Sequence, residues 1–359
     1  MVAAVVVVCL LVVAGLAFEY GRFLSRRGPN TQPVAVSLSS ELTPRQLAEL
    51  LVSLGVSEHP NWLCLHLALS RADRCIVAGP HLLAPATPRE LAAMVCRTSA
   101  RPTEKVTFPE GAHRFAMATT LAAAGIVSRD AFLGATSDRA LLRSLGIAAP
   151  TIDEPELREA IDTAEGFLFP ATYTLHKDSE PADLIRTFAR EAERRWKQAT
   201  ATNARGLAAL EAMGMTRRTI LTLASMVEKE AAVADERPTI ASVFLNRLRD
   251  PLFKRLQSDP TAMYGCVAIP ERIAACRSWN GKASPELNRD PANAYSTYVV
   301  DGLPPGPVAN PGAAAIAAVL APEATTYRYF VAKGGGRHAF SVTYPEHLEA
   351  VKALRERRQ

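Results

Sequence analysis

Apolar residues recur at helical spacing along much of this chain, and one of these apolar stripes ends in an acid. If the segment around it is a helix, Ile220, Leu223 and Val227 lie at i, i+3 and i+7 of one face, and Glu230 falls three residues further along that face. The neighbouring Lys229 points elsewhere. A carboxylate held against apolar surface prefers its neutral form, so its pKa rises and it can donate a proton near neutral pH. The pattern therefore predicts a general acid at Glu230 of the kind that glycosidases use.

The remaining patterns predict a mixed α+β fold. Residues 36–63 and 106–133 form a faint repeat with a period of about 70 residues. Each copy is typical of a short strand, a turn and an amphipathic helix. The helices end at Gly55 and Gly125, where glycine suits a left-handed C-cap. Packing alone explains the apolar matches between the copies, and glycan binding is the alternative interpretation.

Further along, the pattern alternates between buried and solvated elements. The predicted elements are a strand or buried loop over Glu165–Tyr173, charged helices over 181–214, the Glu230 helix, a helix from about Asp235 to Leu248, a helix over 313–320, a strand over 327–332 and a last helix over 345–355. Pro238 suits the first turn of the helix that begins near Asp235.

The N-terminus is apolar and uncharged from Val2 to Phe18, which is the short limit for a membrane span. A membrane anchor over residues 1–18 followed by a linker over 19–34 is one interpretation. A cleaved signal peptide is the other, because residues 15–17 form a small-residue cleavage site. The arginines lie after the apolar run, which would place the body of the chain in the cytoplasm by the positive-inside rule. A start codon placed too far downstream would remove that conflict.

Composition narrows the function classes. The 359 residues are 48% hydrophobic and carry a net charge of +5, with basic residues scattered and without interleaved aromatics, so nucleic-acid binding is disfavoured. Among six cysteines, Cys64 lies near Cys75 and Cys266 near Cys276, which allows two local disulfides and leaves Cys96 over. Buried free thiols are the alternative. No cysteine or histidine spacing indicates zinc.

Four acids crowd residues 228–236, namely Glu228, Glu230, Asp235 and Glu236. Asp235 and Glu236 stand where a helix begins, and acids there complement the helix dipole. For Glu230 the competing interpretation is a structural ion pair with Arg237 or Arg247. Neither an EF-hand, an HExxH motif nor a G-x-S-x-G elbow occurs, which disfavours metal and serine chemistry.

Several motifs in order resemble one family. The segments LASMVEKEAAVADERPTIASVFLNRL, LQSDPTAMYG, AYSTYVVDGLPPGPVANPG and YRYFVAKGGGRHAFS are similar to the MltG (YceG-like) endolytic murein transglycosylases, closely over 221–351 and more loosely through VTFPEGAHRFAMATTLAAAGI and EGFLFPATYTL. These are inner-membrane enzymes that cut nascent peptidoglycan strands. The resemblance implies LysM-like units over 35–145, a catalytic domain over 146–359, and an anchor with an extracytoplasmic, periplasmic body.

The resemblance also implies site residues. The family's catalytic glutamate is the second Glu of E-K-E, which is Glu230, with Glu228 as the fallback. Its polar loops imply cleft walls that bond sugar hydroxyl and N-acetyl groups. The residues concerned are Gln257, Ser258, Asp259, Thr261, Tyr295, Ser296, Thr297 and Asn310.

Some positions depart from the family pattern. Ala171 replaces the usual Asp of F-P-D-T-Y, and Ser296 replaces Asn in Y-N-T-Y. Lys333, Gly335 and Arg337 alter the D-G-K-G-G-H loop, although its histidine stays. None of these changes touches Glu230, so activity is expected, with altered contacts near the loop.

The resemblance implies a one-carboxylate mechanism that needs no cofactor or metal. Glu230 acts as acid and then as base, so that the MurNAc–GlcNAc bond breaks and a 1,6-anhydroMurNAc end forms. A non-catalytic peptidoglycan-binding scaffold and a hydrolytic muramidase, which normally needs two carboxylates, are the alternatives. The expected partners are peptidoglycan glycan strands, the membrane and cell-wall synthases.

Overall fold

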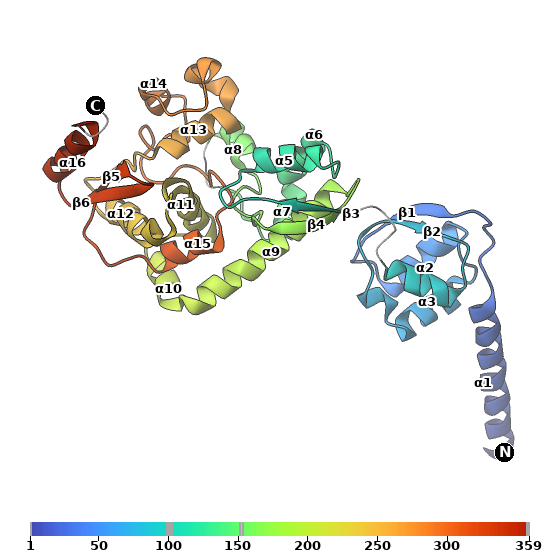
Figure 1. The fold of residues 1–359 in the computed structure, drawn as a ribbon. Coiled ribbons are helices and arrows are strands. Elements are labelled where there is room, and N and C mark those ends of the chain that lie inside the picture. The colour runs from blue at the N-terminus through green and yellow to red at the C-terminus, as the bar shows by residue number, and fades with distance from the viewer. Residues whose placement is uncertain (1, 98–102, 151, 153, 357–359) are drawn as a thin grey trace. The chain divides into compact units, whose positions relative to one another are not determined.

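The computed structural model describes residues 2–97, 103–150, 152 and 154–356. It divides into two compact units, Met1–Thr103 (unit 1) and Glu104–Gln359 (unit 2). Helices predominate, and in the described residues the strands form three two-stranded sheets (Figure 1). The α+β fold class is therefore confirmed.

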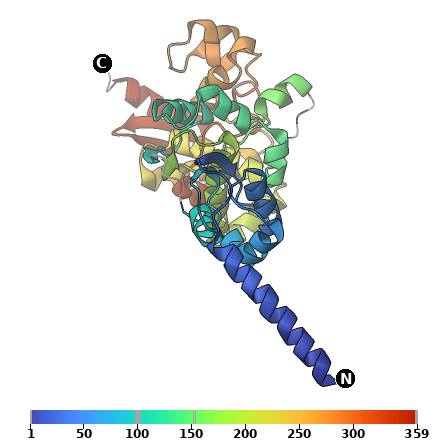
Figure 2. The same cartoon turned by 90° about the vertical axis from the view of Figure 1, so that its right-hand side faces the viewer.

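The apolar N-terminus forms α1, Val2–Ser25, a single helix that projects from the rest of unit 1 (Figure 2). The stretch Val5–Ser25 is long and apolar enough to cross a membrane, and its apolar 18-residue window is not buried in the protein. The helix continues seven residues past the expected anchor, into the expected linker. Its last turn is apolar on one side, so that Phe23 is buried in the core of unit 1 and Tyr20 packs against Trp62. The start of the expected linker is thus a packed helix.

Unit 1 has an antiparallel strand pair with helices packed beside it. Its elements after α1 are β1 (Val34–Leu38), α2 (Pro44–Ser53), α3 (Pro60–Leu69), a 3-10 turn η1 (Ala72–Arg74), β2 (Gly79–Leu83) and α4 (Pro88–Val95). Leu47, Leu51, Leu63 and Leu67 are fully buried between the helices. The unit therefore has its own small core.

The repeat predicted from sequence has the same local geometry in both copies. In α2 and in α5 (Arg114–Ala123) an N-cap side chain accepts a hydrogen bond from the third helical N–H. Gly55 and Gly125 have φ values of +68° and +66°. After each glycine the next N–H donates to the carbonyl five residues back, from Val56 to Leu51 and from Ile126 to Leu121. The predicted C-caps are confirmed.

The second copy belongs to unit 2. Its strand β3 (Thr103–Thr107) pairs with β4 (Thr172–His176), and Phe108 packs edge-on against Phe188 of α9 (Pro181–Thr202). The division consequently falls at residue 103/104, whereas the sequence suggested 145/146. The reason is the position of the strand partner: β4 lies beyond residue 145, so this copy completes its sheet and its core only within unit 2.

Unit 2 surrounds one central helix. Beyond the elements given above, it contains α6 (Arg129–Thr136), α7 (Arg139–Ser144), α8 (Pro155–Ile161), α10 (Ala204–Ala212), α11 (Arg217–Glu230), η2 (Ala234–Glu236), α12 (Arg237–Arg249), α13 (Asp259–Ala268), η3 (Pro270–Arg272), η4 (Ala274–Ser278), α14 (Pro285–Arg289), α15 (Ala313–Leu320), β5 (Tyr329–Gly334), β6 (Arg337–Ser341) and α16 (Tyr344–Glu356). Helix α11 packs against α12, α13 and α15 (Figure 1). Because neighbours cover it on several sides, Leu221 to Val227 are all buried, polar residues included.

Two disulfides form, and one differs from the expected pairing. Cys266 pairs with Cys276 as the spacing suggested. Cys75 pairs with Cys96, which leaves Cys64 free. The pairing of Cys64 with Cys75 that sequence proximity predicted is therefore wrong. Cys64 lies on α3 between the buried Leu63 and Leu67, whereas Cys96, at the end of α4, lies next to Cys75 in space.

Candidate active site

Glu230 is the last residue of α11, at the end of a buried apolar stripe. Ile220, Leu223 and Val227 of that stripe are all 0% exposed, as the periodicity predicted. Glu230 itself is half-buried, so its carboxyl group lies at the edge of the core within reach of the surface. The C-terminal end of a helix carries partial negative charge, which also disfavours an ionised carboxylate.

The carboxyl group of Glu230 has one hydrogen-bond partner among the described residues. Ser258 Oγ donates to Glu230 Oε1 at 2.6 Å. Burial raises the pKa of Glu230 to about 7, and the negative charge of Asp259 adds to the rise. The Ser258 hydrogen bond and the more distant Arg247 charge act in the opposite direction. A carboxyl group with this pKa can both give and take a proton near neutral pH.

The structural ion pair considered for Glu230 is formed by Glu228. Arg237 Nη2 lies 2.9 Å from Glu228 Oε1, and the backbone N–H of Gly312 donates to Glu228 Oε2 at 2.9 Å. Arg247, the other candidate partner, donates to the backbone carbonyls of Leu256 and Arg328. Within the described residues, Glu230 therefore has no ion-pair partner, and Glu228 has a structural role.

Asp235 and Glu236 also have structural partners. Glu236 Oε2 lies 2.8 Å from His338 Nδ1 and accepts from the His338 backbone N–H at 3.1 Å, while Arg337 Nη2 pairs with Asp235 at 2.8 Å. Both acids thus hold the β5–β6 hairpin. The sequence suggested that these acids complement a helix dipole, and the contact with the hairpin is a second reason for their position. The hairpin contains Lys333, Gly335 and Arg337, which depart from the family pattern.

Ser258 is held by a buried hydroxyl cluster. Thr297 Oγ1 accepts from the Ser258 backbone N–H at 2.9 Å, and Thr261 Oγ1 donates to the Ser258 carbonyl at 2.6 Å. The two threonine hydroxyls lie 3.0 Å apart, and both residues are 0% exposed. Gln257, directly before Ser258, has φ +54°, a strained backbone conformation of the kind that concentrates at functional sites. The cluster fixes the hydroxyl that contacts Glu230.

Asp259 is exposed, but its carboxylate is fixed. Its Oδ1 accepts from the Tyr298 hydroxyl at 2.8 Å and from Asn288 Nδ2 at 2.8 Å. Gln257 is exposed as well. Tyr298 is the second tyrosine of the Y-S-T-Y segment, which the resemblance to the family implied as a cleft wall. Asn288 was not among the residues predicted for the site.

Three other residues predicted to line the cleft are buried inside unit 2. Ser296 Oγ donates to the Asn288 carbonyl at 2.6 Å. The Tyr295 ring packs on Tyr264 at 4.8 Å between centroids. Asn310 Nδ2 donates to Glu165 Oε1 at 2.7 Å. These side chains are 0–3% exposed, so they connect loops inside unit 2 and do not line its surface.

Glu165 is the most deeply buried acid among the described residues, and sequence reasoning missed it. It is 2% exposed and accepts from the Arg114 backbone N–H, the Tyr264 hydroxyl and Asn310 Nδ2. Burial raises the pKa of Glu165 to about 7 against these bonds. Glu165 begins the apolar segment EGFLFP. The acid at the start of this apolar run was the sequence signal that could have indicated a buried carboxyl group.

Two hollows adjoin the Gln257–Asp259 segment. One, of about 470 Å³, is lined by Arg255, Gln257, Arg289, Pro291, Tyr298 and Val299. The other, of about 390 Å³, is lined by His113, Lys229, Asp259, Pro260, Met263, Tyr264, Val267, Trp279, Ala283 and Val308. Lys229 precedes Glu230, and Asp259 follows the serine that bonds it. Residues adjacent in sequence to Glu230 and to its partner Ser258 therefore line the two hollows, which together have the polar and apolar surfaces that saccharides need.

Comparison with known proteins places this architecture in a family. The profile of the YceG-like family matches residues 36–353, so the chain belongs to that family. It is similar to the endolytic murein transglycosylase of Bacillus subtilis (strain 168), with 30% identity over 249 residues, 68% of this chain and 64% of that protein. The protein of the same name from Streptococcus pneumoniae (strain D39) is 28% identical over 209 residues, 57% of this chain and 35% of that protein. The matched part is thus less than two thirds of either relative.

A solved structure has the same fold. The crystal structure of a yceG-like protein from Listeria monocytogenes superposes with a TM-score of 0.54 at 26% identity. The match covers 89% of this chain and 99% of that one.

Proposed function

We propose that this protein is an endolytic peptidoglycan lytic transglycosylase with Glu230 as its acid and base. The observation that carries the proposal is the half-buried carboxyl group of Glu230, bonded by a single fixed hydroxyl whose flanking residues, Gln257 and Asp259, line two hollows. The names of the Bacillus and Streptococcus relatives support the substrate class. A hollow near each side of the Ser258 segment suits a strand cut within its length.

The proposed reaction uses one carboxyl group twice. Protonated Glu230 gives its proton to the oxygen between MurNAc and GlcNAc as the bond from that oxygen to MurNAc C1 breaks, and GlcNAc leaves as an alcohol. The Glu230 carboxylate then takes the proton from the MurNAc C6 hydroxyl, whose oxygen attacks C1 and closes the 1,6-anhydro ring. No water is consumed, and Glu230 ends protonated as it began.

Asp259 supports this cycle electrostatically. Its fixed negative charge raises the pKa of Glu230, which keeps the acid protonated before bond cleavage. The same charge would stabilise the positive charge that develops at C1. The alternative function rests on the same residue: if Asp259 activated a water molecule, the pair would act as a muramidase and leave reducing ends.

The remaining expectations belong to the same proposal. Helix α1 would anchor the protein in the inner membrane as a single span, with both units in the periplasm. The two strand–helix copies, paired through β1–β2 and β3–β4, would act as LysM-like glycan contacts. A non-catalytic scaffold that binds peptidoglycan next to cell-wall synthases is the third candidate, and only activity measurements separate it from the enzyme.

The test compares wild type with Glu230→Gln on purified glycan strands, with products analysed by mass spectrometry. Gln keeps the shape but has no proton to give, so kcat should fall by about 10²–10⁴-fold. The exposed Glu211→Gln on α10 is the matched control and should cleave like wild type. Anhydro ends from wild type alone support the proposal. Reducing ends would assign a muramidase, and binding without cleavage would assign a scaffold.

A further inference from the structure

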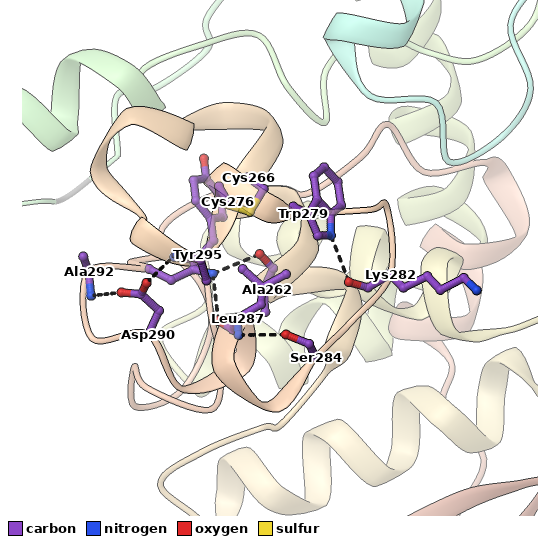
Figure 3. Close-up of a disulfide and its surroundings, with 12 residues drawn as sticks. Ala262, Cys266, Cys276, Trp279, Lys282, Ser284, Leu287, Asp290, Ala292 and Tyr295 are labelled. Atoms are coloured by element: carbon purple, nitrogen blue, oxygen red, sulfur yellow. Dashed lines mark hydrogen bonds between the residues drawn. A yellow bond between two sulfur atoms is a disulfide. The ribbon is translucent and has the colours of Figure 1, made fainter.

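Unit 2 carries a small lobe that the mechanism above does not use. It runs from the end of α13 through η3, η4 and α14. The Cys266–Cys276 disulfide joins the end of α13 to η4 (Figure 3). Its return segment docks closely on α13, where a Cβ at Gly265 would lie 2.1 Å from Asn293 Oδ1. Asn293 Nδ2 donates to the Ala262 carbonyl at 2.9 Å. The lobe is therefore fixed at its base by a covalent bond and by close packing.

Trp279 is held in this lobe at both its backbone and its ring. Its backbone N–H donates to the Cys276 carbonyl at 3.3 Å, three residues after the disulfide. The indole Nε1–H donates to the Lys282 carbonyl at 2.9 Å (Figure 3). Because this is the only polar group of the indole, what the ring offers to a ligand is its apolar surface.

The ring is half-exposed and lines the hollow of about 390 Å³ next to Glu230. Met263 and Val267 of α13 extend the apolar side of that hollow, while Lys229 and Asp259 line it as charged residues. These two charged residues come from separate segments, one preceding Glu230 and the other following its hydrogen-bond donor Ser258. An aromatic surface thus shares a hollow with both segments that build the acid site.

This combination has the chemistry of a saccharide subsite. A pyranose ring has an apolar face of C–H groups and a rim of hydroxyl groups, so it fits an aromatic plane with polar groups beside it. We infer that Trp279 is a platform on which a sugar ring of the glycan strand packs next to the bond that is cut, and that the Cys266–Cys276 lobe holds the platform in place. This inference rests on the proposed function and names a substrate contact for it.

Kinetics of the full chain in detergent test the platform. Trp279→Ala should raise KM for glycan strands by about 2- to 10-fold, the loss expected for one aromatic contact, with the same anhydro product. Trp279→Phe and Trp279→Tyr should recover most of the affinity, because they keep an aromatic plane. Tyr344→Ala removes another exposed aromatic side chain, 56% exposed on α16, and should leave KM unchanged.

Fluorescence gives a measurement that does not need turnover. The chain has three tryptophans, so the difference between the Glu230→Gln spectrum and that of Glu230→Gln/Trp279→Phe reports Trp279. Added glycan strands should change this difference signal. A silent difference signal, or a Trp279→Ala protein with wild-type KM, would overturn the inference. If wild type cleaves nothing but the difference signal still responds to glycan, the proposed activity fails and the platform stands.

Discussion

At the scale of residues, two acids that are close in sequence have different partners in the site. Glu228 is neutralised by Arg237 and the Gly312 N–H, whereas Glu230, two positions later, bonds only the Ser258 hydroxyl among the described residues. The two differ because successive helical positions face different neighbours. Only the second is left available for proton transfer.

The first prediction concerns the pH dependence set by Glu230. The proposed mechanism needs protonated Glu230, and burial raises its pKa to about 7, so kcat/KM should fall as the pH rises through about 7. Ser258→Ala removes a bond that favours the ionised form, so the pKa should rise and the alkaline limb should move to higher pH. Asp259→Asn removes a repelling charge, so the limb should move to lower pH. Rates measured across pH for the three proteins check both signs.

The opposite directions serve as mutual controls. A general loss of activity would lower each profile without moving its limb. Two limbs that move the same way, or none that moves, would contradict the assignment of Glu230 as the titrating acid.

At the scale of elements, the outcome depends on which segments each element meets. Helix α11 presents an acid at its end because α12, α13 and α15 cover the rest of it. The Cys266–Cys276 lobe extends α13, which begins at Asp259, so one helix connects the fixed carboxylate to the aromatic platform. The segment of the proposed acid and the proposed sugar platform are thus joined through one helix.

A prediction follows for the lobe. Cys266→Ser/Cys276→Ser removes the covalent link at its base, so the position of Trp279 should become less defined and KM for glycan strands should rise. Because Glu230 and Ser258 lie outside the lobe, kcat should change little. Steady-state kinetics of the full chain measure both constants.

The second disulfide is the matched control. Cys75→Ser/Cys96→Ser removes a link within unit 1, whose strand–helix copy is itself proposed to contact glycan, so any rise in KM should be smaller than that of the lobe variant. If both double variants raise KM equally, the effect is not specific to the lobe.

At the scale of the whole molecule, unit 2 is held together by a buried polar centre. Glu165 joins the start of α5, the middle of α13 and the Asn310 segment, which lie far apart in sequence. Arg114 N–H and Asn310 Nδ2 donate to Glu165 Oε1, and the Tyr264 hydroxyl next to Oε2 can donate to the ionised acid or accept from the protonated one. The centre is therefore structural, and it lies beneath the candidate site.

Glu165→Gln should consequently destabilise unit 2. The amide NH₂ carries two hydrogens where the protonated acid carries one, and the second would face the Arg114 backbone N–H, at a cost of about 1–3 kcal/mol. The folded-state pKa of Glu165 is raised from 4.5 to about 7, so its contribution to stability is full below the lower value and is lost as pH rises through the upper one. The deficit of the variant should therefore be largest near pH 5 and smaller near pH 8.

Denaturant unfolding at the two pH values measures this difference in the free energy of unfolding. The exposed Glu159→Gln on α8 is the control and should match wild type at both. A deficit that grows with pH would show that Glu165 is ionised and stabilising in the folded protein.

The sequence by itself determined the features that depend on neighbours within two helical turns. The stripe that ends at Glu230, the glycine C-caps at Gly55 and Gly125 and the helix over Ala313–Leu320 were all predicted, because periodicity and capping are local. Tertiary structure decided the rest. Ser258 meets Glu230 across 28 positions, Cys75 meets Cys96 across 21, and Asn310 meets Glu165 across 145. Such partners are chosen by packing between distant segments, which no local pattern records, and they decide which acid is free and which polar residues lie inside.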